Sequence, residues 1–224
     1  MASVTLTSLR ARVRARADMT GSSFVADDAT EVDAWINEAN QQLHAMVVDA
    51  MGEEYVSSTS SFTTVSGTSD YNLPSGFYKL YGVDLNYHGN WRSLKRFETA
   101  ERNTFRETHP ETLPRYRLVG TKLRLYPATT DGLSGSILYA PEATVLSSGS
   151  DTVAYPNGWE QYIVLSAAMQ ALMKEESSVR DLSIERDKIE RQIREVKENR
   201  DLATPRQTVD TTLVDFDPDL WLWR

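Results

Sequence analysis

The sequence of 224 residues contains no cysteine and only three histidines. The absence of cysteine excludes disulfide bonds, thiolate nucleophiles and the commonest structural zinc sites, and it fits production in a reducing compartment such as the cytoplasm. The histidines, His44, His88 and His109, are scattered, and none has a second histidine at ligand spacing. We therefore expect no metal site and expect each histidine to be a surface residue.

Long hydrophobic runs are also missing. The longest mostly apolar segment, YIVLSAAMQALM at residues 162–173, is shorter than the roughly 20 residues that cross a bilayer, so it predicts a buried helix and no membrane partner. The formal net charge is -8 and the sequence pI is about 5.0. An acidic balance argues against broad nucleic-acid binding through a basic surface. Any contact with DNA is expected to be local.

The common catalytic motifs are absent as well. Neither G-x-x-x-x-G-K-[ST] nor G-x-G-x-x-G occurs. The segment GLSGS at residues 132–136 lacks the spacing of the nucleophile elbow and is expected to lie in a loop between strands. The acidic pairs 27–28 and 53–54 lie beside predicted helix ends, where capping explains them. We predict no catalytic residue, no cofactor and no enzyme activity; a hydrolase assembled from dispersed residues is the remaining enzyme alternative.

Apolar residues at helical spacing predict two helices near the N-terminus. The first stripe consists of Leu6, Leu9, Val13 and Ala17, and the second runs from Val32 to Ala50. Asp28 and Glu31 resemble a capping box for the second helix, and Gly52 is placed to cap its C-terminus. The Arg- and Ser-rich start also resembles a transit peptide, but the apolar stripe favours a helix.

Residues 55–146 change to short alternating runs separated by turn residues, which is typical of antiparallel β structure. FYKLYGVDLNY (77–87) and WRSLKRF (91–97) flank a predicted hairpin turn at 88–90, and YRLV-GT-KLRLY predicts a second hairpin ending at Pro127. Further strands are expected at 62–65 and 136–140, and a short helix at 98–107. The aromatic residues of this region are expected to pack mostly in its core or across strands.

Helical periodicity returns after this region. One helix is expected to open at Pro156 and to be covered on two sides, because Val164, Leu165, Ala168 and Leu172 broaden its apolar surface. The next, at about 179–200, has only a narrow apolar seam among charges and is either a surface helix or a contact with a neighbouring subunit. The predicted fold class is therefore α+β: a bundle of two N-terminal and two C-terminal helices, an inserted antiparallel β domain and an extended C-terminal tail.

Two groups of residues have no obvious role inside such a fold. The first is a ladder of arginines on the first helix, which either face solvent or contact an acidic neighbour or DNA phosphates. The second is the C-terminal segment, whose bulky apolar side chains need cover by a partner or by the chain's own helices. The ladder comprises Arg10, Arg12, Arg14 and Arg16. The candidate docking residues of the tail are Phe216, Leu220, Trp221, Leu222, Trp223 and Arg224.

Four segments together resemble phage head-to-tail adaptor proteins, also called connector or head-completion proteins. They are YNLPSGFYKLYGVDL (71–85), LPRYRLVGTKLRLYP (113–127), SILYAP (136–141) and AYPNGWEQYIVLSAAMQAL (154–172). The resemblance lies in the order of these motifs and covers about residues 30–200. It implies a virion protein of the neck that forms a homo-oligomeric ring, commonly a dodecamer. It further implies a portal partner above, tail or neck proteins below, and DNA passing through the lumen without sequence specificity.

The resemblance also implies that the C-terminal extension engages the portal. The expected division is 1–54 and 151–202 for the bundle, 55–150 for the β insertion and 203–224 for a docking tail. An alternative from another class is a β-rich virion module that binds carbohydrate or a host surface, with the helices as an oligomerisation stalk.

Overall fold

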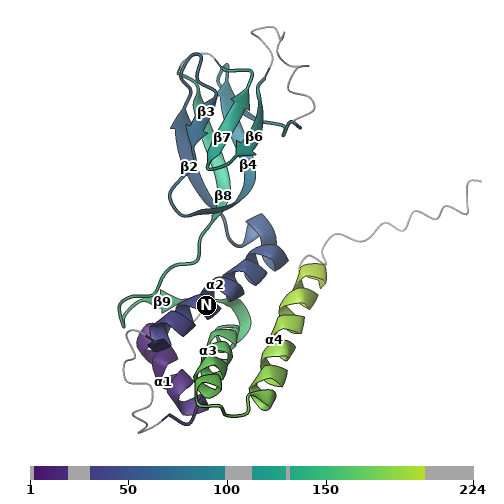
Figure 1. The fold of residues 1–224 in the computed structure, drawn as a ribbon. Helices are drawn as coiled ribbons and strands as arrows, with labels where there is room; N and C mark the ends of the chain where they lie inside the picture. The colour runs from purple at the N-terminus through teal and green to yellow at the C-terminus, as the bar shows by residue number, and fades with distance from the viewer. Residues whose placement is uncertain (1–2, 20–30, 99–112, 130–131, 200–224) are drawn as a thin grey trace, which may run out of the picture.

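A computed structural model describes residues 3–19, 31–98, 113–129 and 132–199. The molecule is elongated, with a helical bundle at one end and a β part at the other (Figure 1). Two segments connect these parts: residues 52–57, which leave the bundle, and residues 142–151, which return to it. The predicted α+β class and the insertion of the β part between two pairs of helices are confirmed.

Four helices form the bundle. They are α1 (Leu6–Arg16), α2 (Asp33–Met51), α3 (Gln161–Lys174) and α4 (Arg180–Asn199). The predicted stripe of α1 is buried, with Leu6, Leu9 and Val13 fully inaccessible. At its start the Thr5 hydroxyl accepts a hydrogen bond from the Ser8 N–H at 3.2 Å, which satisfies one of the free amides of the first turn.

Helix α2 ends where the sequence predicts. Gly52 has a φ of 63° and its N–H donates to the Val48 carbonyl, so the glycine stops the helix in a conformation that side chains disfavour. The chain then forms a short 3₁₀ turn, η2 (Gly52–Glu54). At the other end Val32 makes no side-chain cap, and Asp28 of the expected capping box lies outside the described residues.

Helix α3 contacts each of the other three helices of the bundle, as α2 also does. Its residues 162–169 are all buried, which confirms that this helix is covered on more than one side. The expectation that it opens at Pro156 is wrong. Pro156 begins a separate 3₁₀ turn, η4 (Pro156–Gly158), and the positive φ of 56° at Asn157 prevents that turn from continuing into the helix.

Helix α4 packs on the bundle through its narrow seam. Ile193 is buried, and Leu182, Ile189 and Val196 pack partly against the same core. On its charged faces, Glu190 and Arg194 lie 3.4 Å apart. The Asp187 carboxylate contacts Arg186. The seam is thus occupied within the chain, while the charged faces of α4 remain solvated.

The β part contains two sheets with a core of their own. One has the order β2-β8-β4-β5 and the other β3-β7-β6, with all strand pairs antiparallel. The strands are β2 (Ser58–Thr63), β3 (Asp70–Asn72), β4 (Phe77–Tyr87), β5 (Asn90–Ser93), β6 (Arg115–Val119), β7 (Lys122–Tyr126) and β8 (Ser134–Pro141). Alternate residues such as Leu123 and Leu125 are fully buried between the sheets.

Both predicted hairpins are confirmed. His88 and Gly89 form the β4–β5 turn with φ of 52° and 80°, and Gly120 has a φ of 58° between β6 and β7. The expectation that 132–136 is a loop is wrong for its last three residues, which belong to β8. Gly135 is required there because a Cβ would lie 2.3 Å from the Phe62 ring of the neighbouring strand. The helix expected at 98–107 falls almost wholly outside the described residues.

Replacing a fully buried side chain of α2 should destabilise the bundle. Leu43 is completely inaccessible in the bundle core, so Leu43→Ala is expected to lower the free energy of unfolding by about 2–5 kcal/mol. Ile184→Ala on α4 is the matched control, because Ile184 is 46% exposed, and its effect should stay within about 1 kcal/mol. Urea denaturation followed by circular dichroism measures both. Equal losses for the two variants would contradict the assigned core.

Candidate interaction surfaces

The segment that returns from the β part to the bundle is held by a polar stripe on α2. Asn37, Asn40 and His44 recur at three and four residues, so they lie on one face of the helix. The Asn40 amide donates to the Thr144 carbonyl at 2.9 Å, and His44 Nε2 lies 2.8 Å from the Pro141 carbonyl. Because a carbonyl only accepts, this His44 nitrogen carries the proton. We call this set of contacts the junction.

Asn37 makes the most complete contact of the junction. Its side-chain amide donates to the Leu146 carbonyl at 2.9 Å, and its side-chain oxygen accepts from the Leu146 N–H at 2.7 Å. Both backbone groups of Leu146 are therefore satisfied by one side chain, in the way that a neighbouring strand would satisfy them. Leu146 itself is buried in the bundle core.

Tyr155 adds a further hydrogen bond to the junction. Its hydroxyl donates to the Asn40 side-chain oxygen at 2.8 Å. Burial, with a smaller contribution from Tyr55, raises the pKa of Tyr155 well above its ordinary value of 10.0. The hydroxyl therefore stays protonated and acts as a hydrogen-bond donor. A cavity of about 370 Å³ beside it is lined by Asn40, His44, Tyr55 and Tyr155 among others.

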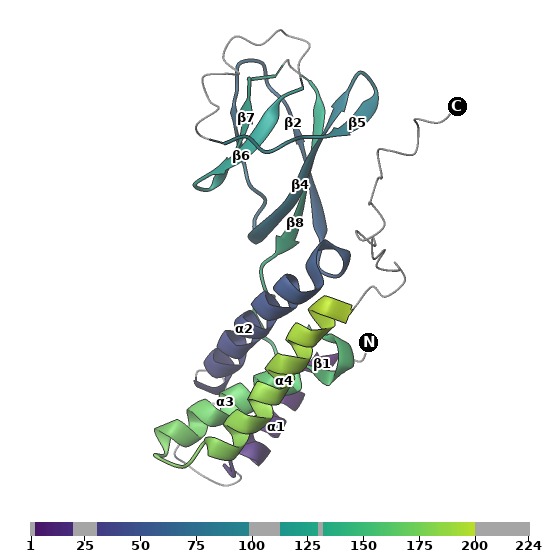
Figure 2. The ribbon, with the colours of Figure 1, turned by 90° about the vertical axis from the view of Figure 1, so that its right-hand side faces the viewer.

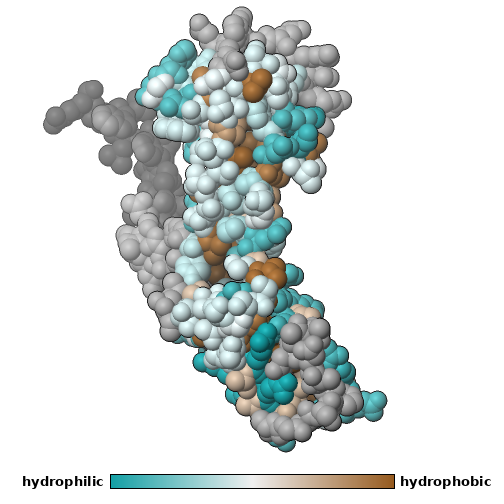
Figure 3. All heavy atoms as spheres, turned by 90° about the vertical axis from the view of Figure 1, so that its left-hand side faces the viewer, coloured by the Kyte–Doolittle hydropathy of each residue, from teal (hydrophilic) through white to brown (hydrophobic). Residues whose placement is uncertain are grey.

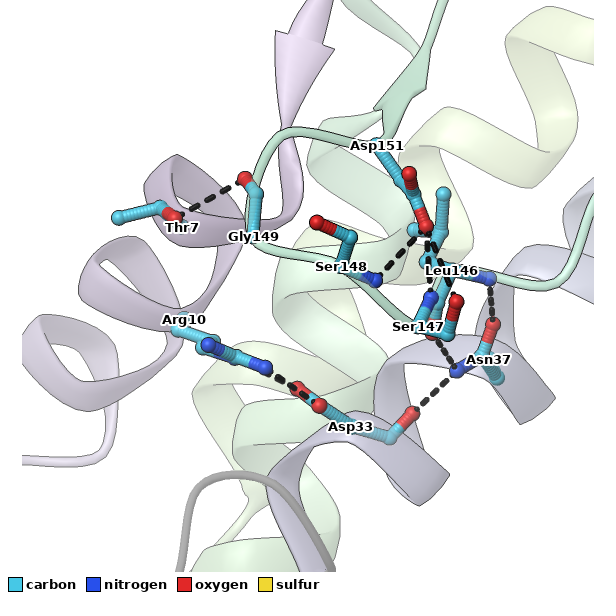
Figure 4. Close-up of polar contacts among 9 residues, drawn as sticks. All are labelled: Thr7, Arg10, Asp33, Asn37, Leu146, Ser147, Ser148, Gly149 and Asp151. Atoms are coloured by element: carbon cyan, nitrogen blue, oxygen red, sulfur yellow. Dashed lines mark hydrogen bonds and ion pairs between the residues drawn. The ribbon is translucent and has the colours of Figure 1, made fainter.

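The loop that follows, residues 147–151, contacts the start of α1 (Figure 4). The Asp151 carboxylate accepts the N–H groups of Ser147 and Ser148, each at 2.8 Å. These bonds lower the pKa of Asp151 from its ordinary value of 3.8. The Gly149 carbonyl accepts from the Thr7 hydroxyl at 2.9 Å. Strands β1 (Val4–Thr5) and β9 (Thr152–Val153) then pair across the same region.

The four arginines singled out in the sequence occupy two sides of α1. Arg10 is directed at α2, where its guanidinium forms two hydrogen bonds with the Asp33 carboxylate, one of 2.7 Å from Nε (Figure 4). Arg16, on the opposite side, lies 3.3 Å from Glu185 of α4 in an exposed pair. Arg14 is half-buried and Arg12 is exposed. Arg10 and Arg16 thus have acidic partners within the chain, while Arg12 points to solvent.

The predicted docking residues of the tail, 216 and 220–224, lie outside the described residues. The last described turn of α4 lies at the end of the bundle nearest the β part (Figure 2). The structure therefore describes α4 up to Asn199, and it does not describe the side chains expected to dock.

The β part carries most of the exposed apolar side chains of the described residues. They are Val65, Tyr78, Trp91, Leu118 and Val119, and the face in Figure 3 shows apolar areas on this part and near the junction. The prediction that the aromatic side chains pack mostly in the core or across strands holds for Tyr71, which is buried against Phe62, whereas Tyr78 and Trp91 are 47% and 57% exposed. Tyr78 lies edge-on to the His44 ring of α2, and Trp91 lies on β5, whose four residues are all exposed.

Two outcomes concern the histidines and metal sites. His44 is half-buried and bonded to Pro141, so the expectation of a simple surface residue is wrong for it. His88 is exposed at the hairpin turn as expected, and His109 lies outside the described residues.

Within the described ranges, no group of three or more metal-ligating side chains comes together. None of the described helices is long and apolar enough to cross a membrane.

The model of a protein family described as SU10 adaptor protein matches residues 4–210, which include the bundle and the whole β part. No curated protein matches the chain.

Removing the side chain at the centre of the junction should destabilise the protein. Asn40 is 2% exposed, and Asn40→Ala leaves the Thr144 carbonyl and the Tyr155 hydroxyl without this partner, which is expected to cost about 1–3 kcal/mol. Gln41→Ala, at the exposed neighbouring position, is the control and should have little effect. Urea denaturation measures both variants. An unchanged midpoint for Asn40→Ala would show that the junction does not contribute to stability.

The 147–151 loop should make stability depend on pH in the acidic range. Because folding lowers the pKa of Asp151 below 3.8, the carboxylate stabilises the fold above that pH, and the contribution is lost as the pH falls through the lowered value. Asp151→Asn is therefore expected to melt at a lower temperature than the natural chain at pH 7. The difference should shrink towards pH 2. Thermal melts across this range test it; a constant difference would contradict the assignment.

Proposed function

Because the chain belongs to the SU10 adaptor protein family, a family of phage head-to-tail adaptors, we propose that it forms a ring between the portal and the tail. The family supports a structural role in the virion. The finer statement, a ring of about twelve copies with a lumen through which DNA passes, is our proposal and follows the closed symmetry that homo-oligomers adopt. The protein would be made in the host cytoplasm and incorporated at the neck of the particle.

The observation that carries this proposal is the extent of the match. Residues 4–210 include α1 to α4, both sheets and the two connecting segments, so the resemblance concerns the whole architecture and not one module. The bundle and the β part have separate cores, which suits a protein that contacts different neighbours at its two ends. The division at residues 54, 150 and 202 stays a prediction.

We further propose that the tail docks on the portal. Burying Phe216, Trp221 and Trp223 is worth on the order of 10 kcal/mol at about 25 cal/mol per Å², while ordering about ten flexible residues costs a similar amount. A single tail would thus bind weakly. A ring presents many tails at once, so that the later contacts become intramolecular and the joint becomes durable.

The arginines of α1 support a second contact of the ring. Arg12 is exposed, whereas Arg10 is held by its hydrogen bonds to Asp33. We propose that the exposed arginines of α1, Arg12 and Arg16, face an acidic surface of a neighbouring subunit or the phosphates of the passing DNA. Contacts to the DNA backbone carry no sequence preference. The protein would act mechanically and catalyse no reaction.

The alternative of a carbohydrate- or host-binding module needs exposed aromatic side chains that share one groove. Among the described residues of the β part, the large exposed aromatic side chains are Tyr78 and Trp91. They lie towards opposite ends of β4, since Trp91 is paired with Asn86. One groove cannot contain both, and the adaptor role is favoured.

Removing the tail should separate assembly from docking. A chain that ends at residue 202 is expected to keep its fold by circular dichroism but to lose co-purification with the portal. Alanine at Phe216, Trp221 and Trp223 should give the same loss, whereas alanine at Thr211 and Thr212 should not. Light scattering of each chain with and without the portal measures the complexes. A truncated chain that binds the portal as well as the full chain does would overturn the docking proposal.

A further inference from the structure

The β4–β5 hairpin carries an exposed tryptophan at the edge of the β part. The pairing of β4 with β8 ends at Leu85 and Gly135, so the last two residues of β4 pair only with β5. Trp91, opposite Asn86 in this ribbon, is 57% exposed, the largest exposure of any described aromatic side chain. All four residues of β5 are exposed. An indole on a protruding ribbon is accessible to a second molecule, and tryptophan is enriched among the residues that dominate protein interfaces.

A cleft of about 320 Å³ lies at the other end of the same strand, between the start of β4 and β6. Its apolar lining includes Tyr78, Leu80, Tyr116 and Leu118, and its cationic side chains are Lys79 and Arg96. Tyr78 and Leu118 are 47% and 37% exposed. The strand β6 is the last strand of its sheet, and residues 95–97 cover part of its outer edge through backbone hydrogen bonds with Tyr116. This cleft is thus a recess of mixed polar and apolar lining with two cations beside β6.

We propose that Trp91 of one copy inserts into the cleft between β4 and β6 of the next copy. The occupant fits in size, because an apolar cavity of about 150 Å³ already accepts a benzene ring. It also fits in charge, because the electron-rich face of an indole is the best aromatic partner for the cations of Lys79 and Arg96. This contact rests on the proposed ring and identifies surfaces that would join its subunits.

The separation of the two surfaces determines the kind of contact. Asn86, which is paired with Trp91, is eight residues from Tyr78 along β4, or about 26 Å at roughly 3.3 Å per residue. Trp91 therefore cannot reach the cleft of its own chain. Figure 2 shows β5 and β6 on opposite sides of the β part. A knob on one side and a recess on the other make a head-to-tail contact, which repeats from copy to copy and closes into a ring if the rotation allows.

The contact is an anchor within a larger interface. An aromatic side chain buries about 150–250 Å², which is less than the roughly 800 Å² per partner of a stable interface. The neighbouring bundles would supply the rest. A single buried tryptophan can still dominate the binding energy when surrounding contacts exclude water from it.

The absence of cysteine in the chain allows a clean cross-linking test. Two full-length variants that keep Trp91 are made, one with Asn90→Cys at the exposed position beside it and one with Leu118→Cys, and they are mixed and oxidised. The mixture should form a disulfide-linked heterodimer. The double variant should form a ladder of covalent multimers on a non-reducing gel. Val65→Cys replaces Leu118→Cys in the control pair, because Val65 is also exposed, at 53%, but does not line the cleft.

A second measurement follows self-association without any new cysteine. Trp91→Ala should weaken self-association by about thirtyfold or more, the loss typical of an interfacial hot spot. Its circular dichroism should be unchanged, because the side chain is exposed. Light scattering of the chain alone and in complex with the portal gives the mass of the assembly in each case.

The outcomes separate this inference from the ring itself. A cross-link between Asn90→Cys copies alone would indicate a symmetric contact and overturn the inference. Multimers by light scattering that give no more cross-linking than the control pair, or that Trp91→Ala leaves intact, would also overturn it while the ring stands. A chain that stays monomeric with and without the portal would refute both.

Discussion

The crossing from the sheet back to the bundle is the constraint on which the arrangement of the two parts depends. After β8 the chain leaves one core and enters another, and along this path it has no neighbouring strand to satisfy its backbone groups. Asn37, Asn40 and His44 provide those partners from one face of α2. The orientation of the β part therefore follows from side-chain hydrogen bonds on a helix that is itself fixed in the bundle core.

The same segment then secures the N-terminal helix. Leu146 enters the bundle core, Asp151 shapes the loop, and Gly149 accepts a hydrogen bond from Thr7. Arg10 and Asp33 join α1 to α2 beside this loop. A half-buried pair of this kind contributes less through its charges than through the hydrogen bonds that fix its geometry. Polar side chains of α1, α2 and the connection from the β part thus form one hydrogen-bonded network beside the apolar core of the bundle.

The order of helices and strands could be predicted from the sequence because each element has a strong local pattern. The stripe of α1, the glycine cap of α2 and the two hairpins depend on nearby residues alone. The junction could not be predicted in the same way. Asn37 and Asn40 interrupt the apolar surface of α2, but their partners lie more than 100 residues away in sequence, and a backbone carbonyl leaves no mark in the sequence. The late start of α3 was also hidden, because Asn157 adopts a positive φ that its residue type permits but does not require.

The two candidate surfaces of the β part also depend on contacts between residues far apart in the sequence. An exposed side chain such as Trp91 and a recess such as the β4–β6 cleft are produced by strand pairing, so residue type alone could not locate either of them. Their use in a ring would depend on the junction, because a head-to-tail contact in the β part and contacts between bundles must be satisfied by the same rotation. If the β part could turn freely about its two connections, each subunit would set its own angle and the ring would not close on one copy number. A hydrogen-bonded junction between two separate cores is a physical means of keeping that angle the same in every copy.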